Sequence, residues 1–352
     1  MKKIFLTTIA LLSIVSASVF GMYGVDSGWI NFLTHGNQFR ARLDQLGFTL
    51  GNDTIKGTFG FNNNAGYGGV YGDLLSTANG GITYDFKPSI SMGLGYTSSL
   101  ISVGVGYNAT IGTGYKDNGK SYNTVAHTPV LVLNAMDNAF RMAIPIQVYA
   151  DGDTNAVSVD SQFRYYTGLD MFPEIRLYLR YGSFTTKTGG VTSKEGESFG
   201  FDFRLYFGSM VEEVALKPYV RLAYNGALGK YHDNTRVEAV KVMKKQQSGS
   251  LGIFAKNAWV LNLVAGLGLS ANSDIVSLYL EPSLGLKVEQ AASFDKNAKE
   301  TYGLGYDVYA EIYITPLKNL EWYFEASIGN VGNTKGVAFA SSTGITWYLP
   351  AL

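Results

Sequence analysis

Charged side chains at every second position of otherwise apolar stretches are the residues of this chain best placed to do chemistry. Side chains of a strand point alternately to opposite faces, so these groups would share one face of a sheet. A basic wall facing an acidic wall across an enclosed space would create a transverse field that acts on ions and polar solutes. We expect the basic wall to comprise Arg141, Arg164, Arg176, Arg180, Arg204, Lys217 and Arg221. We expect the acidic wall to comprise Glu281, Asp307, Glu311, Glu321 and Glu325.

The usual catalytic and metal-binding motifs are missing from the sequence. The histidines, His35, His127 and His232, are far apart, and no motif of a Ser–His–Asp hydrolase flanks them. The chain has no cysteine, which excludes disulfides, thiolate metal sites and cysteine catalysis. Its formal net charge is zero, so nothing favours a nucleic-acid partner. We therefore expect no enzymatic activity, no cofactor and no metal.

The elements that carry these charges are predicted by a period of two. Apolar residues fall on alternate positions in run after run, as in 82–96, 199–207, 259–269, 276–286 and 302–314. Only 16% of the 352 residues are charged, against about 25% in an ordinary globular domain. Glycine, tyrosine and phenylalanine are abundant, with 42, 24 and 20 copies. This pattern predicts an all-β transmembrane barrel with antiparallel up-and-down strands. A soluble two-layer sandwich with the same rows as its core is the alternative.

We expect about fourteen strands. They fall near 54–61, 82–97, 100–111, 128–135, 139–150, 156–166, 174–184, 198–207, 214–224, 256–269, 274–286, 301–314, 320–328 and 337–348. The connections alternate in length, and the long ones are 62–81, 112–127, 185–197, 225–255 and 287–300. Bacterial barrels have short periplasmic turns and longer external loops. The alternation therefore favours the barrel, with both chain ends in the periplasm.

The N-terminal fifty residues fall into two segments. Residues 1–21 have the pattern of a secretory signal peptide, with Lys2 and Lys3 before a short apolar run, and we expect cleavage before Met22. Residues 22–50 fit two descriptions. As helix, they would form a plug-like or periplasmic segment, which we favour. As two further strands, they would raise the number to sixteen. Residues 51–352 form the barrel in either case.

Two further sets of residues, outside the expected lumen, are candidates for contact with the membrane and with external ligands. Aromatic side chains toward the ends of strands fit the girdles of a membrane barrel, namely Tyr181, Tyr224, Trp259, Tyr302, Trp322 and Trp347. The longest connection carries basic side chains at Lys230, Arg236, Lys241, Lys244 and Lys245. It could fold into the barrel mouth and narrow it, bind an acidic ligand, or remain a solvated external loop, which is the reading we favour.

Four sequence stretches carry a more specific resemblance. They are 22–34, 36–48, with the letters GNQFRARLDQLGF, 50–60 and 127–131. In these stretches, in size and in its tyrosine- and glycine-rich strands, the chain resembles the variable surface proteins of intestinal spirochaetes. The resemblance implies an abundant, exposed outer-membrane protein whose paralogues vary antigenically. It supplies no catalytic residues and leaves transport open.

These observations predict a surface antigen with porin-like passive diffusion of ions and small polar solutes. The alternative is a plugged barrel that acts as an adhesin or immune decoy through its external loops. The expected partners are outer-membrane lipid and the diffusing solutes, with host surface molecules or antibodies at the loops. The sequence does not give the oligomeric state. If Arg176, Arg180, Arg204 and Arg221 line an open lumen, changing them together to Gln should shift selectivity toward cations.

Overall fold

The computed structural model describes residues 28–42, 45–63, 88–112, 115–117, 120–122, 124–229, 234–242, 254–330 and 338–350. The first strands are β1 (Gln38–Arg42), β2 (Gln45–Gly51), β3 (Ile55–Asn63), β4 (Pro88–Tyr96), β5 (Ile101–Ile111), β6 (Tyr115–Asp117), β7 (Lys120–Tyr122), β8 (Val125–Ala135) and β9 (Phe140–Ala150). They continue with β10 (Thr154–Leu169), β11 (Phe172–Thr188), β12 (Val191–Tyr206), β13 (Ser209–Val211), β14 (Val214–Ala227), β15 (Trp259–Asn272), β16 (Val276–Gln290), β17 (Thr301–Leu317), β18 (Leu320–Gly329) and β19 (Ala338–Tyr348).

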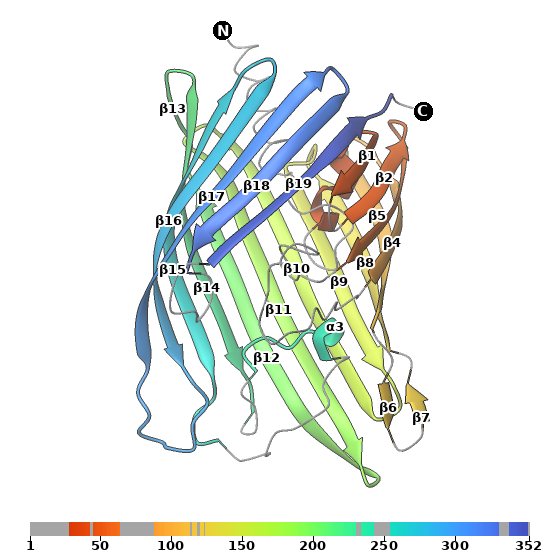
Figure 1. Cartoon of the computed structure of the whole chain (residues 1–352), viewed down its shortest axis with the longest axis vertical. Helices are drawn as coiled ribbons and strands as arrows, with labels where there is room; N and C mark the ends of the chain where they lie inside the picture. The colour runs from red at the N-terminus through yellow and green to blue at the C-terminus, as the bar shows by residue number, and fades with distance from the viewer. Residues whose placement is uncertain are drawn as a thin grey trace, which may run out of the picture.

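The strands form a closed antiparallel barrel (Figure 1). Each pairs with its sequence neighbours, and β19 pairs with β1, where Phe39 lies opposite Trp347. The short β13 follows β12 along the same partner, β14, so the described strands occupy sixteen wall positions, with β6 and β7 as a separate hairpin. The expected number of fourteen is corrected to its alternative of sixteen, because 38–42 and 45–51 are strands of the wall. The helical face expected at Phe39 and Leu46 is replaced by the pairing of β1 with β2, and Leu43 lies outside the described residues.

All fourteen stretches expected from the period of two contain a strand, although 82–87 lie outside the described residues. The stretch 185–197 differs from expectation because it is strand and not a long loop. β11 and β12 continue through it to a tight turn at Gly189 and Gly190, whose φ angles are +59° and +84°. Two consecutive positive φ angles suit a two-residue hairpin turn and favour glycine.

The apolar rows face outward and are widely exposed. Leu263 and Leu284 keep 53% and 55% of their surface accessible, and the same alternation holds on every long strand. A sandwich would bury such rows between its sheets, so the alternative of a soluble sandwich is excluded. No helix among the described residues is long and apolar enough to cross a membrane.

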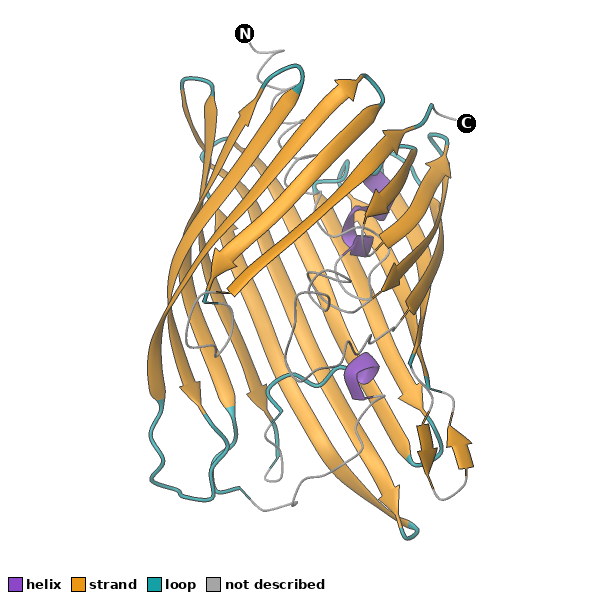
Figure 2. Cartoon of the chain, in the orientation of Figure 1, coloured by secondary structure: helices purple, strands orange, loops and turns teal. Residues whose placement is uncertain are grey.

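Two short helical segments lie inside the barrel at different heights (Figure 2). The 3-10 helix η1 (Gly28–Thr34) packs on β5, β8 and β9 near the end with the short turns. The single-turn helix α3 (Ala239–Val242) packs on β9, β10 and β11 nearer the end with the long connections. Each segment makes a small apolar core against the inner wall. We call these ends the short-turn end and the long-loop end.

Candidate functional site: the charged lumen

The strand register places all twelve wall residues on the inner face. Phe203 and Leu222 are outward partners on β12 and β14, so Arg204 and Arg221, one position along, point inward together. On β17 and β18 the outward pair is Ile312 and Phe324, which turns Glu311 and its neighbours inward. The same parity holds for the remaining residues, on β9, β10, β11 and β16. Basic side chains therefore line β9 to β14, and acidic ones line β16 to β18.

Three carboxylates that the sequence analysis missed stand within the basic wall. The first, Glu174 on β11, is buried at the short-turn end. It accepts hydrogen bonds from Arg176 at 2.5 and 3.1 Å and from Lys217 Nζ of β14 at 2.7 Å. Both cations also lie over the ring of Tyr206. The Arg176 guanidinium is 4.6 Å and the Lys217 ammonium 4.7 Å from the ring centre. One carboxylate thus holds two basic-wall side chains.

The second carboxylate, Asp202 on β12, lies midway along the wall. Arg204 of the same strand donates to both of its oxygens at 2.9 Å. Arg221 of β14 donates to the same oxygens at 3.1 and 3.0 Å. The Arg204 guanidinium lies over the Tyr178 ring, 5.1 Å from the ring centre. The two guanidiniums are therefore fixed around one carboxylate.

The third carboxylate, Asp160 on β10, lies toward the long-loop end. Arg180 of β11 donates to it at 3.1 Å, and Arg236 Nη2 approaches it at 2.7 Å. Arg236 belongs to the segment 234–242 that enters the barrel. The sequence held a signal for all three acids, because each shares its parity with an arginine of its own strand: Glu174 with Arg176, Asp202 with Arg204, and Asp160 with Arg164.

The acidic wall is held mainly by tyrosine hydroxyls. Glu281 accepts hydrogen bonds from Tyr219, at 2.9 Å, and from Tyr279. Tyr309 bridges Glu311 and Glu325, which lie opposite each other on β17 and β18.

Two arginines of β1 approach this wall from the side. Arg42 forms an ion pair with Glu325, and Arg40 donates to Thr346 at 3.2 Å. Tyr348 donates to Glu321 at 3.1 Å. Asp307 is half-buried on β17, opposite Gly329. The charge separation survives this pairing: seven cations with three carboxylates leave +4 on the basic wall, and five carboxylates with Arg40 and Arg42 leave −3 on the acidic wall.

The remaining two basic-wall residues bind neutral groups. Arg141 Nη1 donates to the Asn31 side-chain oxygen at 3.1 Å and to the Thr34 hydroxyl at 3.2 Å, and so ties η1 to β9. Arg164 lies 2.9 Å from the side-chain oxygen of Gln162, with the amide oriented to accept. Arg141 thus serves to dock η1 as well as to line the lumen.

Glycines of β4 and β5 make the seat for η1. A Cβ on Gly93 would lie 2.6 Å from the Trp29 ring, and one on Gly95 would lie 2.4 Å from Leu33. On β5 a Cβ would lie 2.5 Å from the Trp29 ring at Gly106 and 3.1 Å from Leu33 at Gly104. The side chains that these glycines lack would point into the lumen, where η1 takes their place.

His35 follows η1 and is surrounded by cations. Its Nδ1 lies 3.0 Å from Gln38 Nε2, and its carbonyl accepts from Lys56 Nζ at 2.6 Å. Burial lowers the pKa of His35 from 6.5 to about 3, reinforced by the positive charges of four lumen residues, Arg40, Lys56, Arg141 and Arg164. The imidazole is therefore neutral at physiological pH.

The segment 234–242 enters the barrel, which corrects the favoured expectation of a solvated external loop for this part of the longest connection. Lumen side chains of three strands accept hydrogen bonds from its backbone N–H groups. The pairs are Val237 to Ser198 at 2.7 Å, Ala239 to Ser158 at 2.9 Å, and Val240 to Gln147 at 3.4 Å. Gly182 of β11 leaves room for it, since a Cβ there would lie 2.1 Å from the Val237 carbonyl oxygen.

Three other loop candidates, Lys230, Lys244 and Lys245, lie outside the described residues, as do His232 and the expected signal peptide. Lys241 is exposed and pairs with Glu238.

The six expected girdle residues all project outward, with Tyr224 and Trp259 stacked at 6.5 Å between ring centres. His127 also faces outward, against Tyr107. Within the described residues no cluster of three or more His, Asp or Glu side chains could hold a metal ion.

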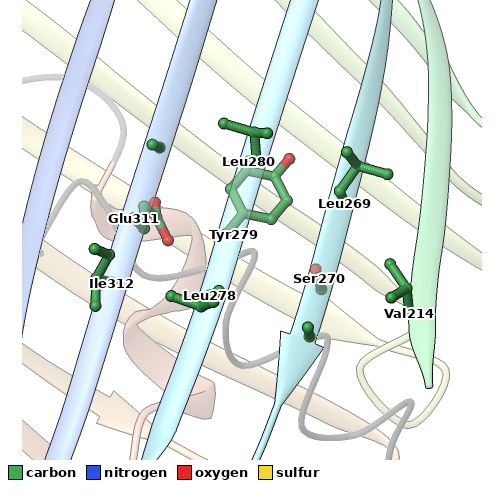
Figure 3. A pocket seen from close by; sticks show the side chains of 10 residues that line it. Val214, Leu269, Ser270, Leu278, Tyr279, Leu280, Glu311 and Ile312 are labelled. Atoms are coloured by element: carbon green, nitrogen blue, oxygen red, sulfur yellow. The ribbon is translucent and has the colours of Figure 1, made fainter.

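A shallow hollow of about 290 Å³ lies over β14 to β17 (Figure 3). Its aliphatic side chains, Leu269, Leu278, Leu280 and Ile312, belong to the outward rows, so the hollow faces lipid. Tyr279 and Glu311, on the same strands, have the opposite parity and belong to the lumen. The hollow therefore lies against the outer side of the strands that carry part of the acidic wall.

Similar folds occur among solved outer-membrane proteins. A bacterial polysaccharide outer membrane secretin is 9% identical, with a TM-score of 0.48 over 87% of this chain and 91% of that one. The translocator domain of the autotransporter NalP from Neisseria meningitidis is 13% identical, with a TM-score of 0.32 over 90% and 89%. A loop-deletion variant of OmpT, an outer membrane protein of Vibrio cholerae, is 9% identical, with a TM-score of 0.33 over 89% and 96%.

No protein with a curated description matches the chain. A family model does match, namely that of the Serpulina hyodysenteriae variable surface protein, over residues 2–348. The match spans almost the whole chain and includes the N-terminal stretches that carried the resemblance. The barrel with its outward apolar rows therefore belongs to an outer-membrane protein, and the chain is a member of the variable surface protein family of this spirochaete.

Proposed function

We propose that this barrel is a surface-exposed protein that passes ions and small polar solutes by passive diffusion. The observation that carries the proposal is the lumen wall, where opposite net charges stand on separate groups of strands. Low-dielectric walls focus the field of such charges on a passing solute. If the barrel follows the usual rule of short periplasmic turns and longer external loops, the short-turn end faces the periplasm and the long-loop end faces the outside.

The two docked segments support the same proposal. Among the described residues, η1 packs mainly on β5, β8 and β9, and the helix of 234–242 packs mainly on β9, β10 and β11. A passage along the acidic wall and the exposed side of the basic wall is compatible with this arrangement. Porins with sixteen strands, the number found here, enclose an aqueous channel.

Single-channel recording tests the proposal. The protein is refolded in detergent, its folding is checked by heat-modifiable gel mobility, and it is added to a planar bilayer. We expect discrete, stable conductance steps. A folded, heat-modifiable protein that remains silent over many insertions would refute passive diffusion.

The second candidate is a binding protein with a plugged lumen. The two inward segments favour it, together with the β11–β12 hairpin, which projects beyond the barrel rim (Figure 1). Its active surface would be this hairpin and the neighbouring connections. Shortening the hairpin between Thr185 and Lys194 should then abolish binding of antibodies or host surface molecules while the barrel still folds.

A further inference from the structure

The basic wall repeats one arrangement three times. In each unit two cations clamp one carboxylate: Arg176 and Lys217 on Glu174, Arg204 and Arg221 on Asp202, and Arg180 and Arg236 on Asp160. The units at Glu174 and Asp202 each keep a net charge of +1. In the third unit Arg236 also pairs with Glu238, which in turn pairs with Lys241, so three cations and two carboxylates again leave +1. The acids therefore do not neutralise the wall.

The burial of the members shows which charge reaches the lumen. The side chain of Asp202 is 0% exposed, whereas those of Arg204 and Arg221 are 24% and 35% exposed. Glu174 is 1% exposed, against 26% for Lys217. In these two units the carboxylates lie behind their cations, so a solute in the lumen meets the positive groups. In the third unit Asp160 is 13% exposed, close to the 15% of Arg180, and Arg236 is the most exposed member at 36%.

The hydrogen bonds leave donors free for a solute. A guanidinium has five N–H groups. Arg204 and Arg221 bind Asp202 through Nε and Nη2. Among the described residues no group accepts a hydrogen bond from their Nη1 atoms, and the buried carboxylate holds both guanidinium planes in place. Guanidinium groups held in this way recognise the paired oxygens of phosphate or carboxylate.

The spacing of the units makes them a series. Their β11 positions, 174, 176, 178 and 180, are consecutive inward positions, and alternate residues of a strand lie about 6.6 Å apart. Arg236 completes the unit nearest the long-loop end, and Lys217 belongs to the unit nearest the short-turn end. An anion leaving one unit is therefore close to the next.

We propose that these three units form an anion ladder that binds and passes small solutes bearing a phosphate or carboxylate group. This inference rests on the proposed diffusion pore and names its solute class. The carboxylates position the arginines, and the lumen-facing N–H groups bind the solute oxygens. The acidic wall keeps the anion on the ladder by repulsion.

The test compares the wild-type barrel with Arg204→Gln/Arg221→Gln in planar bilayers. In a tenfold KCl gradient we expect the wild type to favour chloride, and the double variant to lose most of that preference. Inorganic phosphate should reduce the wild-type chloride current, and at least tenfold more phosphate should be needed in the double variant. The same measurement with acetate at equal ionic strength shows whether a carboxylate reduces the chloride current as phosphate does.

Lys287→Gln is the matched control, because Lys287 also lies on an inward strand position but pairs with Glu289 away from the ladder. It should change selectivity much less than the double variant. Conducting channels without anion preference, or an equal effect of both variants, would overturn the ladder while the pore stands.

A second measurement does not need conductance. Phosphate should raise the temperature at which the folded gel band of the wild type converts to the unfolded one, because a ligand that binds the folded state stabilises it. The double variant should show no such rise. A silent barrel that still shows this phosphate effect would refute the pore and keep the binding site, whereas no effect in the wild type would overturn the site.

Discussion

Trp29 fits against β5 because position 106 is glycine: a Cβ on Gly106 would lie 2.5 Å from the Trp29 ring. Trp29 is itself fully buried and meets the Phe32 ring edge-on at 5.6 Å. A strand glycine usually weakens a sheet, and often marks a site where another group approaches closely. Here the approaching group is the N-terminal segment of the same chain.

Replacing Gly106 with Leu should therefore expel η1 from its seat. The barrel should still form, because leucine keeps the backbone groups through which position 106 pairs with β4 and β8. The single-channel conductance should rise as the segment leaves the lumen. Gly303→Leu is the control, since nothing lies within 4 Å of a Cβ at Gly303. An unchanged conductance and unchanged protease resistance of residues 28–36 in Gly106→Leu would contradict this account.

Trp29→Ala tests the same seat from the other side. Loss of a buried tryptophan costs about 3–5 kcal/mol in a well-packed core. We expect the docked state of η1 to be weakened by a similar amount and protease cleavage near residue 30 to increase sharply. Protease mapping of the folded barrel by mass spectrometry measures this directly, and cleavage equal to that of the wild type would show that the ring contributes little.

The docking of η1 should weaken at acid pH. His35 has a pKa near 3 in the docked state and 6.5 when free, so the undocked state binds more protons between these values. Its contribution to docking is complete above pH 6.5 and is lost as the pH falls toward 3. Protease access to η1 should rise over this window, and His35→Gln should flatten the pH profile. A wild-type profile that matches the variant would rule out His35 as the cause.

The inward segment should depend on the hydroxyls that accept its amides. Ser158→Ala and Ser198→Ala each leave a buried N–H without its acceptor, and each hydrogen bond is worth about 1 kcal/mol. Ser158→Ala also removes the hydrogen bond that this hydroxyl donates to Gln147. We expect larger and noisier conductance steps in the double variant. Ser277→Ala, on the inner face of β16, is a matched control away from the segment. Identical traces from the two variants would mean that 234–242 does not narrow the passage.

Asp202→Asn separates the two roles of a ladder carboxylate. It removes one negative charge, which should increase the preference for anions. It also leaves Arg204 and Arg221 without their common partner, and breaking a buried pair costs about 3–5 kcal/mol. Reversal potentials and urea unfolding of the refolded barrel measure the two effects. Increased stability would show that Asp202 is not the anchor of these arginines.

The period of two was sufficient to predict the barrel, its fourteen long strands and the inward parity of all twelve wall residues. This worked because one face of each strand meets lipid and the other does not, so the requirement repeats along every strand. Residues 38–51 were ambiguous. Apolar positions such as Phe39, Leu43 and Leu46 suit a helix and a strand almost equally over so short a stretch, and only the pairing of Phe39 with Trp347 resolves it.

The sequence alone determined the fold class, the family resemblance and the division of lumen charge between two groups of strands. The tertiary structure decided which charges meet. Asp160, Glu174 and Asp202 lie among basic side chains of neighbouring strands, and the strand register sets these contacts over separations of up to 43 residues. The inward segment adds Arg236 to Asp160 over 76 residues. It also decided that glycines of β4 and β5 serve as a seat, because a missing side chain has meaning only once the group that fills its place is known.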